Sequence, residues 1–404
     1  MKNILIGQSG GPTAVINSSL CGIITEAKKQ ENIDKIYGMI NGIEGFLKDK
    51  TMNLDSLTND ELKLLQTTPA AFLGSCRFKL PKDFTNETYR TLFDKFNVLN
   101  IGYVLYIGGN DSMDTVDKLS FYANEIDADI KFIGIPKTID NDLMGTDHTP
   151  GFGSAAKFVA NTVRNITLDA EVYDKESVTI VEVMGRHAGW LTAASVVARE
   201  TKSDNPLLIY LPEAEFSMEK FFDDVKNALK INKNVVVCIS EGIKDKDGKF
   251  ICEYEGAAGV DTFGHKNLTG AGKFLENQVK DNLGVKVRSI ELNVTQRCAS
   301  NLLSKNDLEE AFNVGVEGVK TATSGETAKM ICMIREGEYN VSYKPVDVST
   351  ISNQEKIFPS EWIIEGNDIS DEFLKYVLPL IAGEVEVPMD NGMAKYLIRT
   401  TSNI

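Results

Sequence analysis

The sequence lacks the cysteine patterns of a disulfide scaffold or a zinc site. Its six cysteines include no Cys-x-x-Cys pair and no spacing typical of metal ligands, and most lie within apolar runs. They are Cys21, Cys76, Cys238, Cys252, Cys298 and Cys332. We therefore expect free thiols, as in proteins of a reducing compartment.

The sequence also lacks a long hydrophobic run. No stretch of about 18 consecutive apolar residues occurs, so we expect no membrane-spanning helix. Met1-Lys2-Asn3 leads directly into an apolar run that begins at Ile4, which leaves no room for a signal peptide. These absences predict a cytoplasmic protein that has no membrane partner.

Positive charge is scarce. The chain has 43 Lys and Arg against 58 Asp and Glu, a formal net charge of −15. Nucleic acids and anionic membranes bind to basic surfaces, so neither is an expected partner. An acidic chain that binds phosphate groups must do so through local clusters of basic side chains.

Short apolar runs alternate with amphipathic stretches from residue 4 to about residue 240. Examples are ILIG, YVLYIG, KFIGIP, VTIVEVMG, PLLIYLPE and NVVVCISEG. This alternation is typical of a parallel sheet with crossover helices, so we predict an α/β fold. The 404 residues suffice for two domains. Near the end, KMICMIREG and EYNVSYKPV predict a strand pair, and SDEFLKYVLPLIAGE predicts a packing helix.

Glycine-rich turns follow two of the predicted strands. Gly10-Gly11-Pro12-Thr13 comes after the run that begins at Ile4, and Gly108-Gly109 follows the run 101–107. Backbone N–H groups of such turns, at the start of a helix, can hold phosphate oxygens. An ordinary strand-to-helix turn is the alternative for the first, and helix capping by Asn110 and Asp111 is the alternative for the second.

Acidic residues cluster after the next predicted strand, at 131–135. The turn Pro136-Lys137-Thr138-Ile139 is followed by Asp140, Asn141 and Asp142. Since ligands of parallel sheets bind at the carboxyl ends of the strands, the two glycine turns and this cluster should meet. A phosphate cradle, a cation and a group of carboxylates are what phosphoryl transfer to an alcohol requires.

The segments GGNDS and PKTIDND resemble the phosphofructokinase family, and further segments match the family in the same order. The match extends from about residue 4 to about residue 300. The other segments are Gly10 to Asn17, Leu73 to Phe78, Glu182 to Arg186, Ile239 to Gly242, Arg288, and Gln296-Arg297.

The resemblance implies two similar doubly wound, Rossmann-like parallel-sheet domains that face each other across an active-site cleft. Residues 1–153 plus about 292–345 would form the phosphoryl-donor domain, and 154–291 the fructose 6-phosphate domain. Residues from about 346 to 404 would form a C-terminal packing extension. The resemblance also implies a homo-oligomer, either a dimer or a tetramer.

On the donor side, the resemblance implies that Asp140 is the general base, which takes the proton of the sugar 1-hydroxyl. Lys137 would place a positive charge beside the transferred phosphoryl group, and Arg77 would bridge the donor and acceptor phosphates. Thr138 would donate a hydrogen bond to the sugar phosphate or to the leaving group. Asn110 and Asp111 would contact Mg²⁺. The implied pyrophosphate-binding residues are Gly10, Gly11, Arg77, Gly109, Asn110, Asp111 and Lys137.

On the acceptor side, the resemblance implies a fructose 6-phosphate pocket in which arginines grip the 6-phosphate and Glu241 accepts from sugar hydroxyls. Its residues would be Thr138, Asp140, Asp142, Met184, Gly185, Arg186, Glu241, Arg288 and Arg297. We expect the basic residues of both sides to converge. Where ATP-using relatives have an arginine that reaches across from a neighbouring subunit, this chain has Ser177. Either Lys175 or Arg164 compensates, or fewer charges hold the phosphate.

Two positions favour pyrophosphate as the donor. Asp111 stands where ATP-using members have glycine, and Lys137 stands where they have a small residue. Both side chains would occupy space that a nucleotide needs, whereas pyrophosphate is shorter. The alternatives are an ATP-dependent phosphofructokinase and a non-catalytic regulatory subunit that binds sugar phosphate. The second alternative should lack Arg77 or Asp140, and this chain has both.

Overall fold

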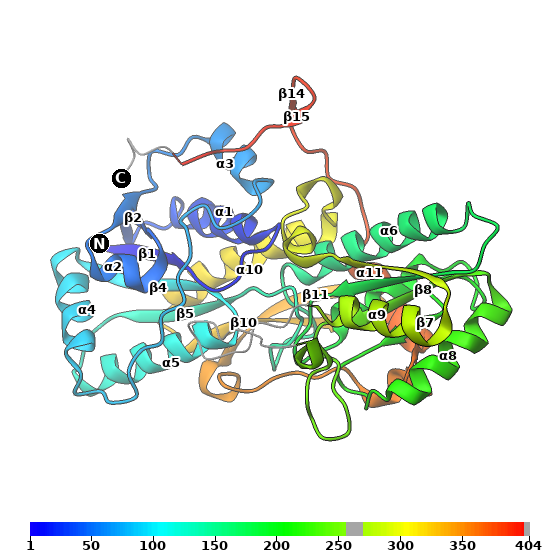
Figure 1. Ribbon diagram of the computed structural model, residues 1–404. Helices are drawn as coiled ribbons and strands as arrows, with labels where there is room; N and C mark the ends of the chain where they lie inside the picture. Colours follow the sequence, from blue (N-terminus) through cyan, green and yellow to red (C-terminus); the bar gives the residue numbers. More distant parts are fainter. Residues whose placement is uncertain (256–269, 400–404) are drawn as a thin grey trace.

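The computed structural model describes residues 1–255 and 270–399, and most of its strands form two sheets (Figure 1). In the described residues, the first sheet has seven strands in the order β11-β10-β5-β4-β1-β2-β3. They are β1 (Lys2–Gln8), β2 (Ile33–Met39), β3 (Thr51–Asn53), β4 (Ile101–Gly108), β5 (Lys131–Pro136), β10 (Lys329–Glu336) and β11 (Asn340–Asp347). The inner strands are parallel, whereas β3 and β11 pair antiparallel at the two edges.

The second sheet is parallel throughout, with the strand order β7-β8-β6-β9. Its strands are β6 (Ser177–Val183), β7 (Leu208–Tyr210), β8 (Asn234–Ser240) and β9 (Lys286–Glu291). The predicted α/β fold with parallel-sheet domains is therefore confirmed. The antiparallel edge at β11 follows from its short connection to β10, because a parallel pairing needs a long crossover. The strand pair expected near the end of the chain is this β10–β11 pair.

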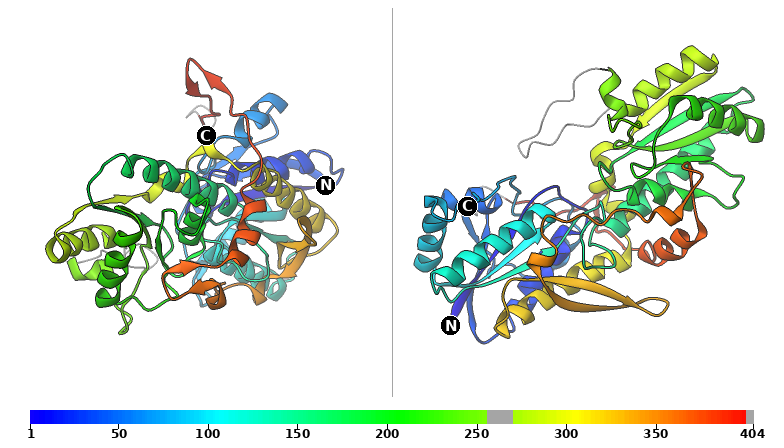
Figure 2. Two further views of the ribbon diagram at one scale, coloured as in Figure 1. Left: turned by 90° about the vertical axis from the view of Figure 1, so that its right-hand side faces the viewer. Right: turned by 90° about the horizontal axis from the view of Figure 1, so that it is seen from below.

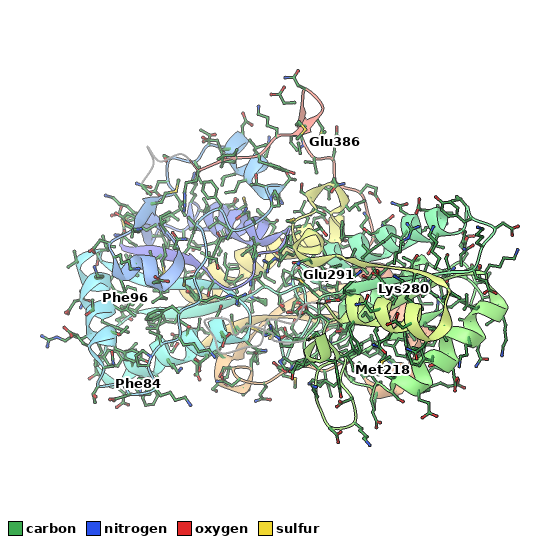
Figure 3. The ribbon with its side chains drawn as sticks, in the orientation of Figure 1. Phe84, Phe96, Met218, Lys280, Glu291 and Glu386 are labelled. Atoms are coloured by element: carbon green, nitrogen blue, oxygen red, sulfur yellow. The ribbon has the colours of Figure 1, made fainter. Side chains whose placement is uncertain are left out.

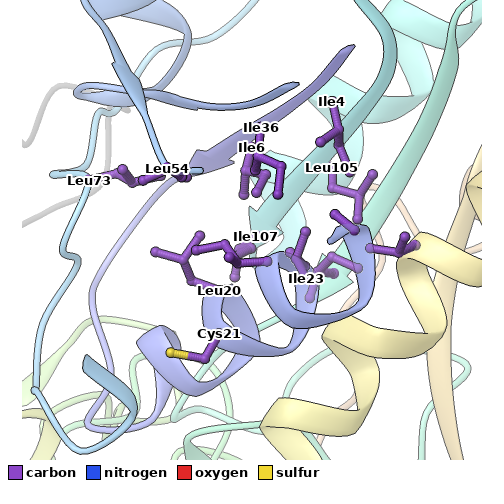
Figure 4. Close-up of a cluster of buried hydrophobic side chains, with 14 of the residues drawn as sticks. Ile4, Ile6, Leu20, Cys21, Ile23, Ile36, Leu54, Leu73, Leu105 and Ile107 are labelled. Carbon is purple, nitrogen blue, oxygen red and sulfur yellow. The ribbon is translucent and has the colours of Figure 1, made fainter. Parts of the chain in front are cut away.

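Helices cover both faces of the first sheet, and alternate residues of each strand point to opposite faces. Ile4, Ile6, Leu105 and Ile107 pack against α1 (Ile16–Ala27) and α10 (Lys305–Thr323), as Figure 4 shows for α1. The residues between them, such as Leu5, pack against helices on the other face. Those helices are α2 (Gly42–Leu47), α4 (Glu87–Val98) and α5 (Asn110–Glu125), and α3 (Asn59–Gln66) lies beside α1.

Two glycines let α1 and α10 pack in direct backbone contact. A Cβ at Gly22 would stand 2.0 Å from the carbonyl oxygen of Phe312, and a Cβ at Gly315 would stand 2.2 Å from that of Ser19. Neither distance is possible, so only glycine permits this approach. The close pair joins the N-terminal helix to a helix nearly three hundred residues later in the chain.

Helices also cover both faces of the second sheet. On one face α6 (Phe152–Ala170), α7 (Trp190–Ala193) and α11 (Asp371–Leu380) share a core with alternate residues of the strands. On the other face lie α8 (Met218–Ile231) and α9 (Ala271–Leu283). The two sheets lie at opposite ends of the molecule in both Figure 1 and the right-hand view of Figure 2.

The C-terminal region contacts both halves of the molecule. Phe358, Phe373 and Tyr376 pack around Trp190 in the core of the second sheet, which confirms the expected packing helix. Two short strand pairs flank this helix: β12 (Ile363–Ile364) with β13 (Asp368–Ile369), and β14 (Met389–Asp390) with β15 (Met393–Ala394). Figure 3 labels Glu386 on the segment that leads to β14.

Beyond β15 the chain returns to the first sheet. The backbone N–H of Leu397 donates to Thr68 Oγ1 (3.0 Å), and Arg399 donates to the carbonyl oxygen of Leu73 (3.0 Å). Residues 400–404 of the predicted extension lie outside the described residues. The domain limits at 153, 292 and 346 stay predictions, since strand pairing assigns strands to sheets and does not set limits.

In the described residues, no helix is both long enough and apolar enough to span a bilayer. All six cysteines are free thiols, and all but Cys298 are buried.

Candidate active site

The first glycine turn lies against two cationic side chains. The ammonium group of Lys137 donates to the carbonyl oxygen of Gly11 (2.6 Å). A Cβ at Gly10 would stand 3.4 Å from Lys137 Nζ, and a Cβ at Gly11 would stand 3.0 Å from the guanidinium of Arg297. Gly10 also has a φ of 75°, which favours glycine. The turn therefore lets two positive charges approach its backbone, as an anion site requires.

Lys137 is buried among charged groups. Its side chain follows β5 and is 3% exposed, and its backbone N–H donates to the carbonyl oxygen of Gly108 (3.0 Å). Burial lowers the pKa of Lys137 to about 8; Asp140 and Asp142 oppose this shift, and Arg297 and Arg77 add to it. Arg77, which was predicted for the donor side, and Arg297, which was predicted for the sugar phosphate, therefore both lie near one ammonium group. An anionic ligand placed among them would restore the favourable charge balance.

Asp140 lies near residues that were predicted for the donor side and near residues that were predicted for the sugar side. Its backbone N–H donates to Thr138 Oγ1 (3.0 Å), which holds the turn. Burial raises the pKa of Asp140, and Lys137, Arg186 and Arg297 offset only part of that rise. Burial, with help from Asp140 and Glu355, raises the pKa of Asp142 to about 7. A raised pKa makes the carboxylate of Asp140 a stronger base, and the three cations around it limit the rise, as suits a general base.

The second glycine turn opens α5, and Asn110 is the first residue of that helix. Within the described residues, both polar atoms of the Asn110 carboxamide are buried without a hydrogen-bond partner. The carboxylate of Asp111 is 41% exposed and pairs with Lys79 at 3.3 Å. A buried amide that lacks a partner is costly, so Asn110 is prepared for a ligand. Sequence reasoning missed Lys79, which belongs to no motif.

Several of the residues that were predicted to bind the sugar follow strands of the second sheet. Met184, Gly185 and Arg186 follow β6, and the backbone N–H of Gly185 donates to Glu241 Oε1 (3.4 Å). The N–H of Met184 donates to Gln296 Oε1 (3.3 Å), which places these residues beside Arg297.

Two features mark this side of the site as a place for a polar ligand. Burial raises the pKa of Glu241 to about 7; the Gly185 hydrogen bond and Arg186 oppose this, and Asp140 and Glu182 add to it. Arg186 Nε is buried and has no partner among the described residues. Both groups would gain from hydrogen bonds to a polar ligand.

Arg288 does not join this cluster. It lies on β9 opposite Thr179, well before the carboxyl end of β6, and pairs with Asp169 at 3.5 Å. It lines a separate cavity of about 270 Å³ between β9 and α6, together with Thr162, Asn165 and Ile166. Within one chain, Arg288 therefore lies apart from the basic side chains that were predicted to converge with it. The number of residues between Arg288 and Arg297 did not reveal where along its strand Arg288 would lie.

Residues from the C-terminal region lie directly behind the turn. The backbone N–H of Lys356 donates to the carbonyl oxygen of Asp142 (2.7 Å). The hydroxyl of Tyr376 accepts from Asn141 Nδ2 (2.9 Å) and donates to the carbonyl oxygen of Asp147 (2.8 Å). No motif in the sequence marked these residues, and the region 346–404 was expected only to pack against the two domains.

Comparison with known proteins agrees with this geometry. A family model described as Phosphofructokinase matches residues 3–321. The chain belongs to this family. It is 36% identical over 400 residues to the pyrophosphate--fructose 6-phosphate 1-phosphotransferase of Halomonas elongata, covering 97% of this chain and 95% of that protein. It is 37% identical over 405 residues to the protein of the same name from Rhodospirillum rubrum, covering 98% and 99%.

A solved structure with the same architecture is the pyrophosphate-dependent phosphofructokinase of Marinobacter aquaeolei. The TM-score is 0.89 at 36% identity, and the match covers 98% of this chain and 95% of the other. The resemblance stated from the motifs is therefore confirmed, and it extends over nearly the whole chain.

Proposed function

We propose that this phosphofructokinase transfers a phosphoryl group reversibly from pyrophosphate to O1 of fructose 6-phosphate, a step of glycolysis and, in reverse, of gluconeogenesis. The proposal rests on one observation: a cluster of basic residues lies next to a carboxylate and to the predicted sugar loop. Lys137, Arg297 and the turn at Gly10-Gly11 form a cationic cradle, and Asp140 stands next to it with Arg186 and the sugar loop beyond.

The chemistry needs a base and charge neutralisation. Asp140 takes the proton of the O1 hydroxyl while O1 attacks the nearer phosphorus of pyrophosphate. The bond from that phosphorus to the bridging oxygen breaks, and orthophosphate leaves with the bridging oxygen. Lys137, Arg77 and Thr138 stabilise the charge on the phosphoryl oxygens, and Asp142, Met184, Gly185 and Glu241 orient the sugar. Catalysis then rests on positioning and electrostatics, as in other phosphoryl transfers.

Pyrophosphate is the proposed donor because Lys137 occupies the cradle. Its ammonium group contacts Gly11, so a longer nucleotide would have to displace a buried cation. Asp111, at the start of α5, adds a negative charge that would repel a further phosphate. The ATP-dependent alternative requires the ammonium group of Lys137 to move.

Mg²⁺ is the proposed cofactor, held together with the donor phosphates. Asn110 Oδ1 is buried without a partner among the described residues, so an amide oxygen is available to a hard cation. The described residues contain no group of three or more His, Cys, Asp and Glu that could hold a metal by itself. This fits a magnesium ion that takes most of its ligands from substrate and water. When bound, it neutralises phosphate charge.

We further propose that the enzyme is a homo-oligomer in the cytoplasm, and that Arg288 serves a neighbouring copy. Ser177, at the position where ATP-using relatives have an arginine that crosses to the next subunit, pairs with Lys286. Arg288 lies two residues further along the same strand face, so it shares that surface. Its task would be to grip the 6-phosphate of the adjacent site. The six free cysteines agree with a reducing compartment.

The donor is tested by measuring fructose 1,6-bisphosphate formation with pyrophosphate and with ATP, each with Mg²⁺. We expect turnover with pyrophosphate to exceed turnover with ATP by orders of magnitude. Equal rates would refute the donor assignment, and no turnover with either would favour the regulatory subunit. In the double variant Asp111→Gly, Lys137→Gly, activity with ATP should rise and activity with pyrophosphate should fall.

Mixing two defective variants tests the role of Arg288. Asp140→Ala lacks the base, and Arg288→Ala should have a raised KM for fructose 6-phosphate. If Arg288 acts across subunits, mixed oligomers contain one intact site, and activity at low fructose 6-phosphate should recover on mixing. Absence of recovery in oligomers shown to be mixed would place Arg288 in its own chain or outside the site.

A further inference from the structure

The segment from Glu355 to Phe358 lies against the turn that carries Asp140. Leu143 and Glu355 form an antiparallel bridge, and the backbone N–H of Lys356 donates to the carbonyl oxygen of Asp142 (2.7 Å). This short contact adds a strand-like edge to the turn after Asp142. The turn is thus supported from behind by residues more than two hundred positions later in the sequence.

The ammonium group of Lys356 adds a second set of bonds to the same turn. It donates to the carbonyl oxygens of Asp147 (2.7 Å) and Thr146 (3.2 Å) and to Asn141 Oδ1 (3.4 Å). These acceptors lie at both ends of the segment that follows Asp140. The ammonium group therefore joins the two ends of the segment from Asn141 to Asp147 through hydrogen bonds.

The same segment reaches the sugar loop on the second sheet. Trp190 Nε1 donates to the carbonyl oxygen of Lys356 (3.1 Å), and the ammonium of Lys356 stands 4.9 Å above the Trp190 ring. Glu213 Oε1 accepts from the backbone N–H of both Gly189 (2.8 Å) and Phe358 (2.9 Å). Gly189 and Trp190 directly follow the loop that contains Met184, Gly185 and Arg186. Residues 355–358 therefore connect the base-bearing turn to the sugar-binding loop.

We propose that Lys356 is a positioning residue for phosphoryl transfer: through its bonds to Asn141, Thr146 and Asp147 and its contact with Trp190, it holds Asp140 in register with the sugar loop. The inference rests on the proposed function. In this role Lys356 acts through the turn, since its ammonium bonds go to Asn141, Thr146 and Asp147. Loss of the cation should loosen the alignment of base and sugar hydroxyl, and misplacement by about 1 Å can cost about a hundredfold in rate.

The chain offers a matched control in Lys157 on α6. Its ammonium also donates to two carbonyl oxygens, those of Gly383 (2.7 Å) and Leu303 (3.1 Å), and to Glu384 Oε1 (3.0 Å). Lys157 is buried and Lys356 is half-buried, their partners are of the same kind, and none of the Lys157 partners belongs to the site. Lys157→Met and Lys356→Met should therefore both lower the thermal unfolding midpoint, and only Lys356→Met should change turnover.

The experiment begins with wild-type turnover with pyrophosphate and fructose 6-phosphate. If the wild-type enzyme has none, the proposed function fails before Lys356 is tested. With an active wild type, we expect Lys356→Met to lower kcat by about ten- to a hundredfold while the KM for pyrophosphate changes less than about threefold. Assays well below the unfolding midpoint, with Lys157→Met as the reference, exclude lost stability as the cause. Lys356→Arg, which keeps the charge, should recover part of kcat.

A double variant separates positioning from a general structural effect. If Lys356 acts by placing Asp140, then Lys356→Met should lower turnover much less in an Asp140→Ala background than in the wild type. Equal losses in both backgrounds would overturn the inference, as would a Lys356→Met enzyme with wild-type kcat. A parallel loss of kcat in Lys157→Met would also overturn it, since any lost buried cation would then suffice.

Discussion

The two sides of the turn from Lys137 to Asp147 differ in what they contact. The front, with Lys137 and Asp140, faces the glycine turn and the arginines of the site. The back, with Asn141 and Asp147, is held by Lys356 and Tyr376 from the C-terminal region. The front has cations close together and unpaired polar atoms nearby, whereas the back has its bonds satisfied.

The lysines on the two sides show what this difference means. Burial lowers the pKa of Lys137 and of Lys356 alike, each to about 8. Carboxylates oppose the shift at both lysines, but only at Lys137 do neighbouring cations, Arg297 and Arg77, add to it. A buried cation that also faces other cations gains from an anionic ligand, whereas one that faces only carboxylates and carbonyl oxygens is already stabilised. Substitutions on the front should therefore alter activity, and those on the back should alter stability or alignment.

The largest expected effect is that of Asp140→Ala on the front. Turnover should fall by about two to four orders of magnitude, the usual range for a positioned general base. The free energy of unfolding should not fall, because the substitution removes a carboxylate that burial destabilises. Steady-state kinetics and urea denaturation measure the two quantities. If most of the turnover remained, the base would have to be assigned to Asp142.

A pH series on Lys137 should show the next largest effect. Because its folded pKa is lowered to about 8, Lys137 loses its charge as the pH rises through that value. The KM for pyrophosphate should then rise, by at most about tenfold per pH unit. In Lys137→Arg the guanidinium stays charged, so this rise should be absent even if the affinity is lower. A wild-type profile that parallels that of the arginine variant would contradict the role of Lys137.

Tyr376→Phe tests the back of the turn. Removing the hydroxyl leaves the buried Asn141 amide nitrogen without its acceptor, while the Asp147 carbonyl keeps its bond from Lys356; the free energy of unfolding should fall by about 1–3 kcal/mol. Tyr343→Phe is the control, because its hydroxyl accepts an exposed bond from Asn313 Nδ2 (3.3 Å). Urea denaturation of both variants checks the prediction. Equal changes in the two would mean that the back of the turn is no more tightly held than the surface.

The smallest effect concerns His148, which lies between Asp147 and Glu310 at 2.8 Å from each. Burial lowers its pKa, but the two carboxylates outweigh burial and the net shift is upward. A raised folded pKa means that its stabilising charge is present in full below the ordinary histidine pKa, about 6.5, and is lost as the pH rises through the folded value.

The difference in unfolding free energy between the wild type and His148→Gln should therefore shrink as the pH rises through the folded pKa of His148. The slope is at most about 1.4 kcal/mol per pH unit, since one proton is involved. Subtracting the variant removes the contributions of Asp142, Glu182 and Glu241, whose raised pKa values are each about 7. A constant difference across the range would show that His148 does not titrate with folding.

The front of the site was predictable because its residues lie in local motifs. The run 101–107 became β4, the run 131–135 became β5, and the turns after them meet because parallel strands end at one edge. Lys137 beside Gly11 follows from this rule. The convergence expected for Arg288 was wrong within one chain, because spacing along the sequence does not say where on a strand a residue lies.

The sequence by itself determined the α/β class, most strands of the two sheets and the glycine turns that follow β1 and β4, because hydrophobic periodicity and glycine act over a few residues. Only the tertiary structure decided which distant segments support those turns. Lys356 and Tyr376 reach the turn through packing of the C-terminal region on the second sheet, and no local pattern encodes that contact. Long-range packing depends on the whole chain, so the back of this site became visible only in three dimensions.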